Sequence, residues 1–163
     1  MSVFNVHERV LMADAGRVGA LIDTLGSHED LLWPHRDWPP MTFDRPLSPG
    51  AMGNHGPVRY TVTAYVPATW VRFTFRAPHG FGGFHEFTAL PLDEERTVLR
   101  HTLAMNVRRT ARLTWPLAWR PLHDACLEDS LDRAELACTG AVERPARRSP
   151  YTRLLRGLVH GLS

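Results

Sequence analysis

The pattern of apolar and polar residues predicts a strand at the start of the chain. Residues 2–12 alternate between the two types with a period close to two, as expected for a half-buried strand. One face of this strand would carry Phe4, Val6, Glu8, Val10 and Met12. If that face lies inside, Glu8 is a carboxyl group in apolar surroundings and a candidate proton donor. The alternative is that Glu8 pairs with an arginine at the sheet edge.

Two short helices are expected after this strand. Asp14 is a suitable N-cap for a helix over residues 15–25, which Gly26 would end. Ser27 can cap a second short helix, and this helix has to end before Pro34. The segment that follows, residues 33–40, is rich in proline and tryptophan and predicts irregular chain over one end of the core.

From residue 41 the period becomes two, which predicts a series of strands. Residues 48–56 interrupt it as a Gly-rich loop. The expected strands cover residues 41–47, 57–66, 70–76, 84–92 and 96–107. Short turns join the last four, so they form an antiparallel meander.

Residues 117–139 predict one long amphipathic helix, and Pro116 and Pro121 confine its uninterrupted part to about 121–139. At 100° per residue, the acidic residues gather on one flank, beside an inner stripe. The inner stripe consists of His123, Leu127, Ser130, Leu131, Ala134 and Cys138. The two cysteines, Cys126 and Cys138, would lie roughly 18 Å apart along this helix, too far for a disulfide, and predict buried thiols.

Composition and charge narrow the class of protein. The chain has 163 residues, of which 44% are apolar and 22% charged, so one globular domain is expected. The absence of a leader-like N-terminus and of a long apolar run predicts a cytoplasmic protein. All 19 basic residues other than histidine are arginines, which excludes lysine nucleophiles.

The basic excess is concentrated in the last 23 residues, 141–163, which carry five arginines and one glutamate. Because the folded body has no basic excess, we expect no nucleic-acid partner. The chain is thus divided into a domain over residues 1–140 and a basic linker with a short amphipathic helix over residues 141–163.

Several segments resemble a known family: LLWP…DWPPM (31–41), HGPVRYTV (55–62), FRAPHGFGGFHEF (75–87) and RPLHDACLEDSLDRAE (120–135). They are similar to the START-like (SRPBCC) superfamily, in its bacterial polyketide cyclase/dehydrase-like branch. The resemblance implies an α+β helix-grip fold, in which a curved antiparallel sheet of six or seven strands wraps around a long C-terminal helix. It also implies an apolar cavity between the sheet and this helix, and it transfers no catalytic residue.

Three histidines point to chemistry in that cavity. His85 and His101 lie on the inner faces of neighbouring expected strands, and His123 lies on the inner stripe of the helix. A turn centred on residue 93 would place His85 opposite His101, and a shift of one residue would place them diagonally. Each histidine could touch a ligand, or be a buried residue satisfied within the core. The predicted ligand-binding set is Tyr60, Val62, Phe73, Phe75, His85, Phe87, His101, His123 and Leu127.

Two functions fit these features. The first is a protein that binds a hydrophobic, aromatic or polyketide-like small molecule in the cavity. The second is a cyclase, aromatase or dehydrase that uses the cavity histidines or Glu8 for proton transfer. No metal-ligand spacing is found, so we expect neither a metal nor a cofactor.

Two further features concern the surroundings of the cavity. Four aromatic residues lie in or beside loops and could form a lid: Trp33, Trp38, Phe81 and Phe84. In the tail, one helical face would consist of Tyr151, Leu154, Leu155, Leu158, Val159 and Leu162. That face could dock on its own domain, on a second copy in a homodimer, or on an anionic membrane surface. We favour docking on protein over membrane contact.

Overall fold

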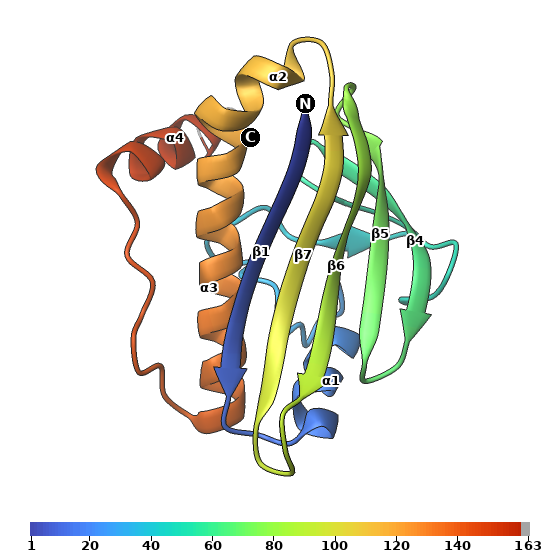
Figure 1. The fold of residues 1–163 in the computed structure, drawn as a ribbon, viewed down its shortest axis with the longest axis vertical. Coiled ribbons are helices and arrows are strands. Elements are labelled where there is room, and N and C mark those ends of the chain that lie inside the picture. Colours follow the sequence, from blue (N-terminus) through green and yellow to red (C-terminus); the bar gives the residue numbers. More distant parts are fainter. Residues whose placement is uncertain (161–163) are drawn as a thin grey trace.

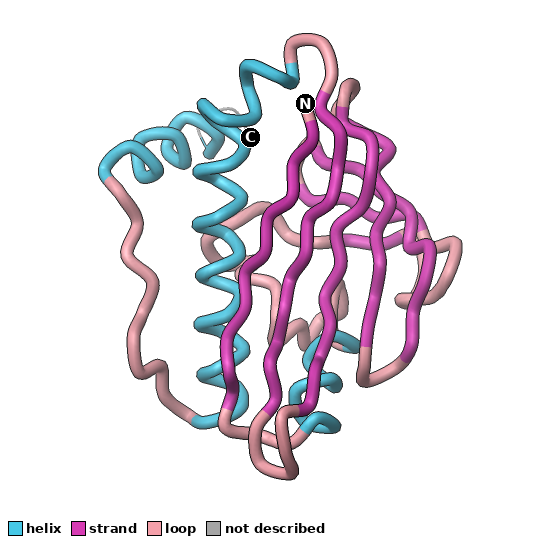
Figure 2. Tube along the Cα trace, in the orientation of Figure 1, coloured by secondary structure: helices cyan, strands magenta, loops and turns pink. Residues whose placement is uncertain are grey.

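The computed structural model describes residues 1–160, with residues 158–160 described by their backbone alone. Seven antiparallel strands form one curved sheet in the order β1-β7-β6-β5-β4-β3-β2. The long helix α3 (Arg120–Thr139) runs beside β1 (Ser2–Leu11), and the short helix α1 (Ala15–Asp23) lies at the lower end of the view, against β5, β6 and β7 (Figure 1; Figure 2). The α+β helix-grip architecture expected from the sequence is therefore confirmed.

The elements follow one another in a simple order. The strands are β1 (Ser2–Leu11), β2 (Thr42–Phe43), β3 (Met52–His55), β4 (Val58–Val66), β5 (Trp70–Ala77), β6 (Phe81–Pro91) and β7 (Thr97–Val107). The helices are α1 (Ala15–Asp23), α2 (Ala111–Thr114), η1 (Trp115–Trp119), α3 (Arg120–Thr139) and α4 (Pro150–His160). The meander predicted from the period of two is present, and β3 forms inside the segment expected to be a Gly-rich loop.

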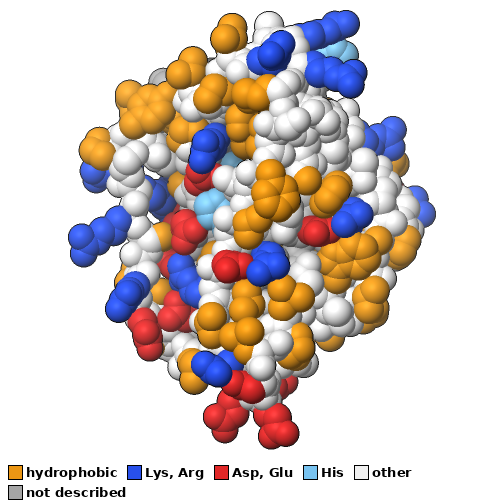
Figure 3. All heavy atoms as spheres, viewed as in Figure 1, with side chains coloured by type: hydrophobic (Ala, Val, Ile, Leu, Met, Phe, Trp, Pro, Cys, Tyr) orange, Lys and Arg blue, Asp and Glu red, His pale blue; other side chains and the backbone are white. Residues whose placement is uncertain are grey.

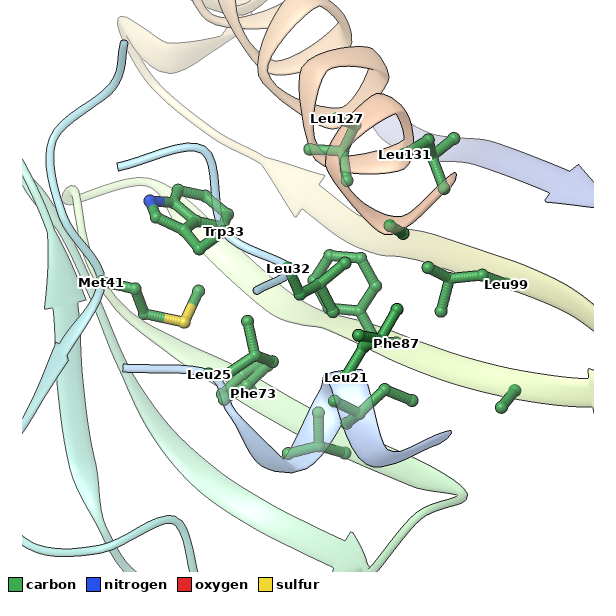
Figure 4. Close-up of a cluster of buried hydrophobic side chains, with 14 of the residues drawn as sticks. Leu21, Leu25, Leu32, Trp33, Met41, Phe73, Phe87, Leu99, Leu127 and Leu131 are labelled. Atoms are coloured by element: carbon green, nitrogen blue, oxygen red, sulfur yellow. The ribbon is translucent and has the colours of Figure 1, made fainter. Parts of the chain in front are cut away.

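The core lies between the sheet, α1 and the inner stripe of α3. Leu127, Leu131 and Ala134 are buried there, as the helical spacing predicted. They meet Phe87 and Leu99 of the sheet in one apolar cluster (Figure 4). Burial of this cluster ties α3 to the strands and leaves its acidic flank beside β1.

The second short helix expected after residue 27 is not formed. The Asp30 carboxylate instead accepts hydrogen bonds from the backbone N–H groups of Gly26, Leu32 and Trp33. These bonds satisfy the backbone in a series of turns, which removes the need for a helical ladder. The first helix, α1, forms as expected, with the Asp14 carboxylate accepting from the backbone N–H of Arg17 at its N-terminus.

The strand face that carries Phe4, Val6, Glu8, Val10 and Met12 points outward, so the interpretation of Glu8 as a buried acid is wrong. The alternative is confirmed, because Glu8 pairs with Arg100 on the neighbouring strand at 2.7 Å. Figure 3 shows apolar side chains scattered over this outer surface, and charged side chains of both signs along the seam between β1 and α3. Glu8 therefore cannot serve as a buried acid in the cavity.

The inner face of β1 is polar because it packs against the acidic flank of α3. Arg9 binds Asp132, Glu135 and Glu128 there, and His7 binds Asp124 and Glu128. Such a network can satisfy a strand without apolar contacts. The alternation of apolar and polar residues therefore assigns the wrong face of β1 to the core, because the polar face is the one that pairs with the acidic residues of α3.

The long helix begins earlier than expected and contains a wide turn. Residues 111–139 are helical without a break, but Trp115–Trp119 form a π-turn that includes Pro116. Pro121 has no N–H to donate to the carbonyl of Leu117, four residues before it. The Tyr151 hydroxyl donates to that carbonyl instead, so the tail completes the hydrogen bonding of this turn.

Helix α4 lies across the upper part of α3 (Figure 1). Thr152 is buried and Leu155 half-buried, whereas Tyr151 and Leu154 are exposed. The tail therefore contacts its own domain through Leu155 of the expected face and through Thr152, which lies outside that face. The side chains of residues 158, 159 and 162 lie outside the described part. None of the described helices is long and apolar enough to cross a bilayer.

Candidate ligand-binding cavity

A cavity of about 580 Å³ lies between the sheet and the N-terminal half of the long helix. This volume is in the usual range for sites that hold small organic molecules. Its walls are mostly aromatic and aliphatic, with several imidazoles among them. The lining residues are Trp33, Trp38, Pro39, His55, Pro57, Val58, Phe75, Phe81, His85, His101, Leu103, Thr114, Trp115, Ala118, Trp119, Leu122, His123, Cys126 and Leu127.

Five of the nine predicted ligand-binding residues line this cavity: Phe75, His85, His101, His123 and Leu127. The other four, Tyr60, Val62, Phe73 and Phe87, are fully buried one layer behind the wall. They support the imidazoles from there, since Phe73 stacks on His85 and Phe87 meets His101 edge-on. Phe73 and Phe87 pack with Leu21, Leu25 and Leu32 in the core (Figure 4), so α1 and the segment after it cover this part of the inner face.

His85 and His101 form a hydrogen-bonded pair in the cavity wall. The β6–β7 turn is centred one residue later than residue 93, so Phe87 lies opposite His101 and His85 opposite Leu103. The diagonal arrangement still brings His85 Nδ1 within 3.3 Å of His101 Nε2. The remaining nitrogens, His85 Nε2 and His101 Nδ1, are buried without a partner among the described residues.

These imidazoles are neutral. Burial lowers the pKa of His85 and of His101 well below the ordinary value, and the neighbouring histidines lower both further. Burial likewise lowers the pKa of His55 to about 3. A charged imidazole in this cavity would lose its hydration with no counter-charge nearby, which is why the neutral form is favoured.

His123 is held from the outer side by a carboxylate. Its Nδ1 lies 3.3 Å from Asp124 Oδ1, which also accepts from Asn5 Nδ2 at 3.1 Å and faces His7 Nε2 at 3.1 Å. Burial lowers the pKa of His123, and although the hydrogen bond to Asp124 opposes this, the net shift is downward. His123 Nε2 is buried with no partner among the residues described.

His7 occupies the seam between β1 and α3. Its Nδ1 lies 2.7 Å from Glu128 Oε1, so both ring nitrogens face carboxylate oxygens. Burial works against the charged form, but the hydrogen bonds to Asp124 and Glu128 outweigh it and raise the pKa of His7. The same bonds, with those of His123, hold the pKa of Asp124 well below its usual range despite its partial burial.

His7, His123 and Asp124 offer three ligand atoms within 4.8 Å of one another, which is close enough for a metal ion. In the structure, these atoms bind one another. The Asp124 oxygen already faces three donors, and each histidine directs an N–H at it. A cation would have to displace these bonds, so a hydrogen-bonded cluster accounts for the arrangement.

Part of the expected aromatic lid is present. Trp33, Trp38 and Phe81 line the cavity, whereas Phe84 lies on the outer face of the sheet under the guanidinium of Arg72, 3.9 Å from the ring centroid. Trp38 donates its indole N–H to Asp129 at 2.7 Å, and Arg148 of the tail binds the same carboxylate. The tail thus holds the wall of the cavity in place.

Sequence patterns missed several cavity residues. His55 lies in the Gly-rich segment 48–56, where no period is visible, yet its ring contacts that of Trp33 in a tilted arrangement with ring centroids 4.7 Å apart. The Gly56–Pro57 pair is a turn signal that could have indicated a hairpin there. Trp115 was missed because the helix was expected to begin only at residue 117, and Trp119 because the prolines confined its uninterrupted part to about 121–139.

Comparisons with known proteins support the fold. No family model and no curated protein matches the chain. Norcoclaurine synthase from Thalictrum flavum, in complex with dopamine and hydroxybenzaldehyde, superposes with a TM-score of 0.62 and 12% identity, over 83% of this chain and 85% of that chain. This chain therefore has the helix-grip fold.

Two further solved structures are similar to about the same degree. A protein from Thermobifida fusca superposes with a TM-score of 0.63 and 15% identity, over 90% of this chain and 99% of that chain. CalU16 from Micromonospora echinospora gives a TM-score of 0.59 and 10% identity, over 99% and 86%. At these identities the likeness concerns the helix-grip fold alone, and the function has to be argued from the cavity.

Proposed function

We propose that this protein binds a flat, hydrophobic, aromatic or polyketide-like small molecule in the cavity between the sheet and α3. The observation that carries the proposal is the composition of the wall, in which four tryptophans and four histidines surround one space of about 580 Å³. Aromatic walls favour flat ligands by offset stacking, and isolated polar groups orient them. The norcoclaurine synthase structure, in complex with dopamine and hydroxybenzaldehyde, supports the choice of aromatic ligands.

The proposal is tested by ligand titration with a blocked cavity. Ala118 lines the cavity, so Ala118→Trp would fill part of it, whereas Leu113→Trp adds the same side chain at a 70% exposed position of the adjoining helical turn. Flat aromatic ketones should quench the tryptophan fluorescence of the wild type and of Leu113→Trp, and bind Ala118→Trp at least tenfold more weakly. Equal binding to all three proteins would contradict a ligand site in this cavity.

A proton-transfer enzyme of the cyclase or dehydrase type is the second candidate. The pairing of His123 with Asp124 favours it, because a carboxylate that orients an imidazole leaves the other nitrogen available as a base. Such a base would remove a proton from the carbon next to a ligand carbonyl. Exchange of that proton for deuterium in an aryl ketone, followed by NMR, should accelerate with the wild type and not with His123→Gln. Exchange at the uncatalysed rate would leave ligand binding as the function.

A further inference from the structure

The cavity carries a defined arrangement of hydrogen-bond donors and acceptors, which follows from the hydrogen bonds behind its wall. Each neutral imidazole has one N–H and one lone pair. Which nitrogen carries the proton is decided by the partner of the other nitrogen. For His85, His101 and His123, one nitrogen is engaged within the protein and the other is buried without a partner among the described residues.

At His123 the proton position is fixed. A carboxylate only accepts hydrogen bonds, so Nδ1, which faces Asp124, carries the proton. Nε2 of the neutral ring is then a lone pair. The Asp124 side chain is held in this orientation, because Asn5 Nδ2 and His7 Nε2 of β1 donate to the same oxygen.

The His85–His101 pair is constrained in a different way. One N–H lies between the two rings, donated by one ring and accepted by the other. The acceptor ring then carries its own N–H on its outer nitrogen, and the donor ring has a lone pair on its outer nitrogen. In both proton arrangements, the pair presents one donor and one acceptor to a ligand.

We infer that the ligand is a neutral hydroxylated carbonyl compound, whose hydroxyl groups donate to His123 Nε2 and to the His85–His101 pair while its carbonyl accepts from that pair. The three unpartnered nitrogens provide two lone pairs and one N–H, which match two hydroxyls and one carbonyl. The ring centroids of His101 and His123 are 5.3 Å apart, a separation that the substituents of one flat ring system can span.

A carboxylate does not fit this arrangement. It offers no donor to the two lone pairs, and it would be buried among neutral imidazoles without a cation. A hydrocarbon of the same shape would fill the cavity but leave all three nitrogens without hydrogen bonds. Sites built to bind a hydroxyl reject analogues that lack it for this reason. His7 and Asn5 are positioning residues, since they act on the ligand only through Asp124 and His123.

This inference rests on the proposed function, and the experiment separates the two. Dihydroxyflavone, dimethoxyflavone, flavone and a flavone carboxylate are titrated against the full-length protein, with quenching of tryptophan fluorescence as the measurement. We expect dihydroxyflavone to bind at least tenfold more tightly than the other three. Equal affinity of flavone and dihydroxyflavone would overturn the inference and leave the proposed function intact. If no flavone binds, both fail.

A variant and a spectroscopic measurement test the position of the proton. Asp124→Asn replaces a carboxylate, which only accepts, with an amide that can also donate, so the proton of His123 is no longer held on Nδ1. The preference for dihydroxyflavone over flavone should then fall several-fold while flavone affinity is kept. Asp132→Asn, the same change two turns further along α3 where the acid binds Arg9, is the control and should keep the preference. Nitrogen-15 NMR of the unmodified protein should show His123 Nε2 without a proton. A protonated Nε2 would overturn the inference whether or not the variants fold.

Discussion

His7 Nδ1 lies 2.7 Å from the carboxylate of Glu128, and this pair ties the first strand to the long helix. Because the folded pKa of His7 is raised above its ordinary value of 6.5, the charged form stabilises the folded state. This contribution is fully present below the unfolded pKa and is lost as the pH rises through the folded pKa. His7→Gln should therefore destabilise the protein strongly at about pH 6 and much less at about pH 9.

The measurement is the difference in melting temperature between His7→Gln and the wild type across this pH range. His28→Gln is the matched control, since His28 is an exposed imidazole in a turn far along the chain from the seam. The melting temperature of His28→Gln should stay close to that of the wild type at each pH. A His7→Gln difference that does not shrink as the pH rises would contradict a charged His7.

The buried imidazoles predict the opposite pH dependence. His101 stays neutral in the folded state, because burial lowers its pKa, but it binds a proton in the unfolded state below about pH 6.5. Its contribution to stability is present above that pH and is lost as the pH falls, by up to about 1.4 kcal/mol per pH unit. In His101→Phe, the loss of unfolding free energy between about pH 6 and pH 5 should be smaller by roughly this amount.

Urea unfolding at a series of pH values measures this slope. The variant also leaves His85 Nδ1 without its partner, so its stability at neutral pH should be lower by about 1–3 kcal/mol. The two effects are separable, because the first appears only in acid. An unchanged slope would mean that His101 is protonated in the folded state.

The sequence allowed the fold to be predicted where local periodicity and burial agree. The inner stripe of α3 and the faces of β6 and β7 follow from spacing alone, since each of these elements has one apolar side in the core. The same rule failed at β1. There the charged partners of Arg9 lie more than 100 positions away on α3, and no local pattern shows that a polar face will be neutralised.

The candidate site could be predicted only in part, for a related reason. His85, His101 and His123 stand out because they interrupt apolar faces, and all three line the cavity. His55 does not interrupt an apolar face, because it lies in a Gly-rich segment without a visible period. The role of His7 depends on two carboxylates of α3, those of Asp124 and Glu128. The packing of α1 and the segment after it decided the rest, since Phe73 and Phe87 have the right periodicity but are buried in the core with Leu21, Leu25 and Leu32.

Close packing of α1 on the sheet predicts a specific sensitivity at Gly19. A Cβ atom at this position would lie 1.8 Å from the backbone oxygen of Ala68, so Gly19→Ala forces the helix away from the β4–β5 turn. We expect a loss of unfolding free energy of about 2–4 kcal/mol, typical of overpacking against rigid backbone. Gly157→Ala is the control, since a Cβ there meets nothing within 4 Å, and it should be neutral or slightly stabilising. Similar stability of the two variants would contradict this packing.

The tail predicts a link between its own docking and the cavity wall. Arg148 binds Asp129, which also accepts the indole N–H of Trp38, and Arg156 pairs with Asp37 at 2.8 Å in the same loop. Removal of the chain after Gly140 should lower the melting temperature and alter Trp38 fluorescence, because the loop loses both arginines. Arg148→Gln should reproduce part of this loss, about 1–3 kcal/mol, whereas Arg153→Gln, at an exposed position of α4, should not.

The same truncation distinguishes the other partners predicted for the tail. Sedimentation should give the same oligomeric state for the truncated and the full-length chain if α4 serves its own domain alone. A dimer that dissociates on truncation would assign part of the exposed face at Tyr151 and Leu154 to a second copy. Unchanged stability together with loss of binding to anionic vesicles would instead assign it to a membrane, since basic and apolar side chains on one helix suit that surface. We expect the first result, because the contacts of Arg148 and of the Tyr151 hydroxyl are already made within one chain.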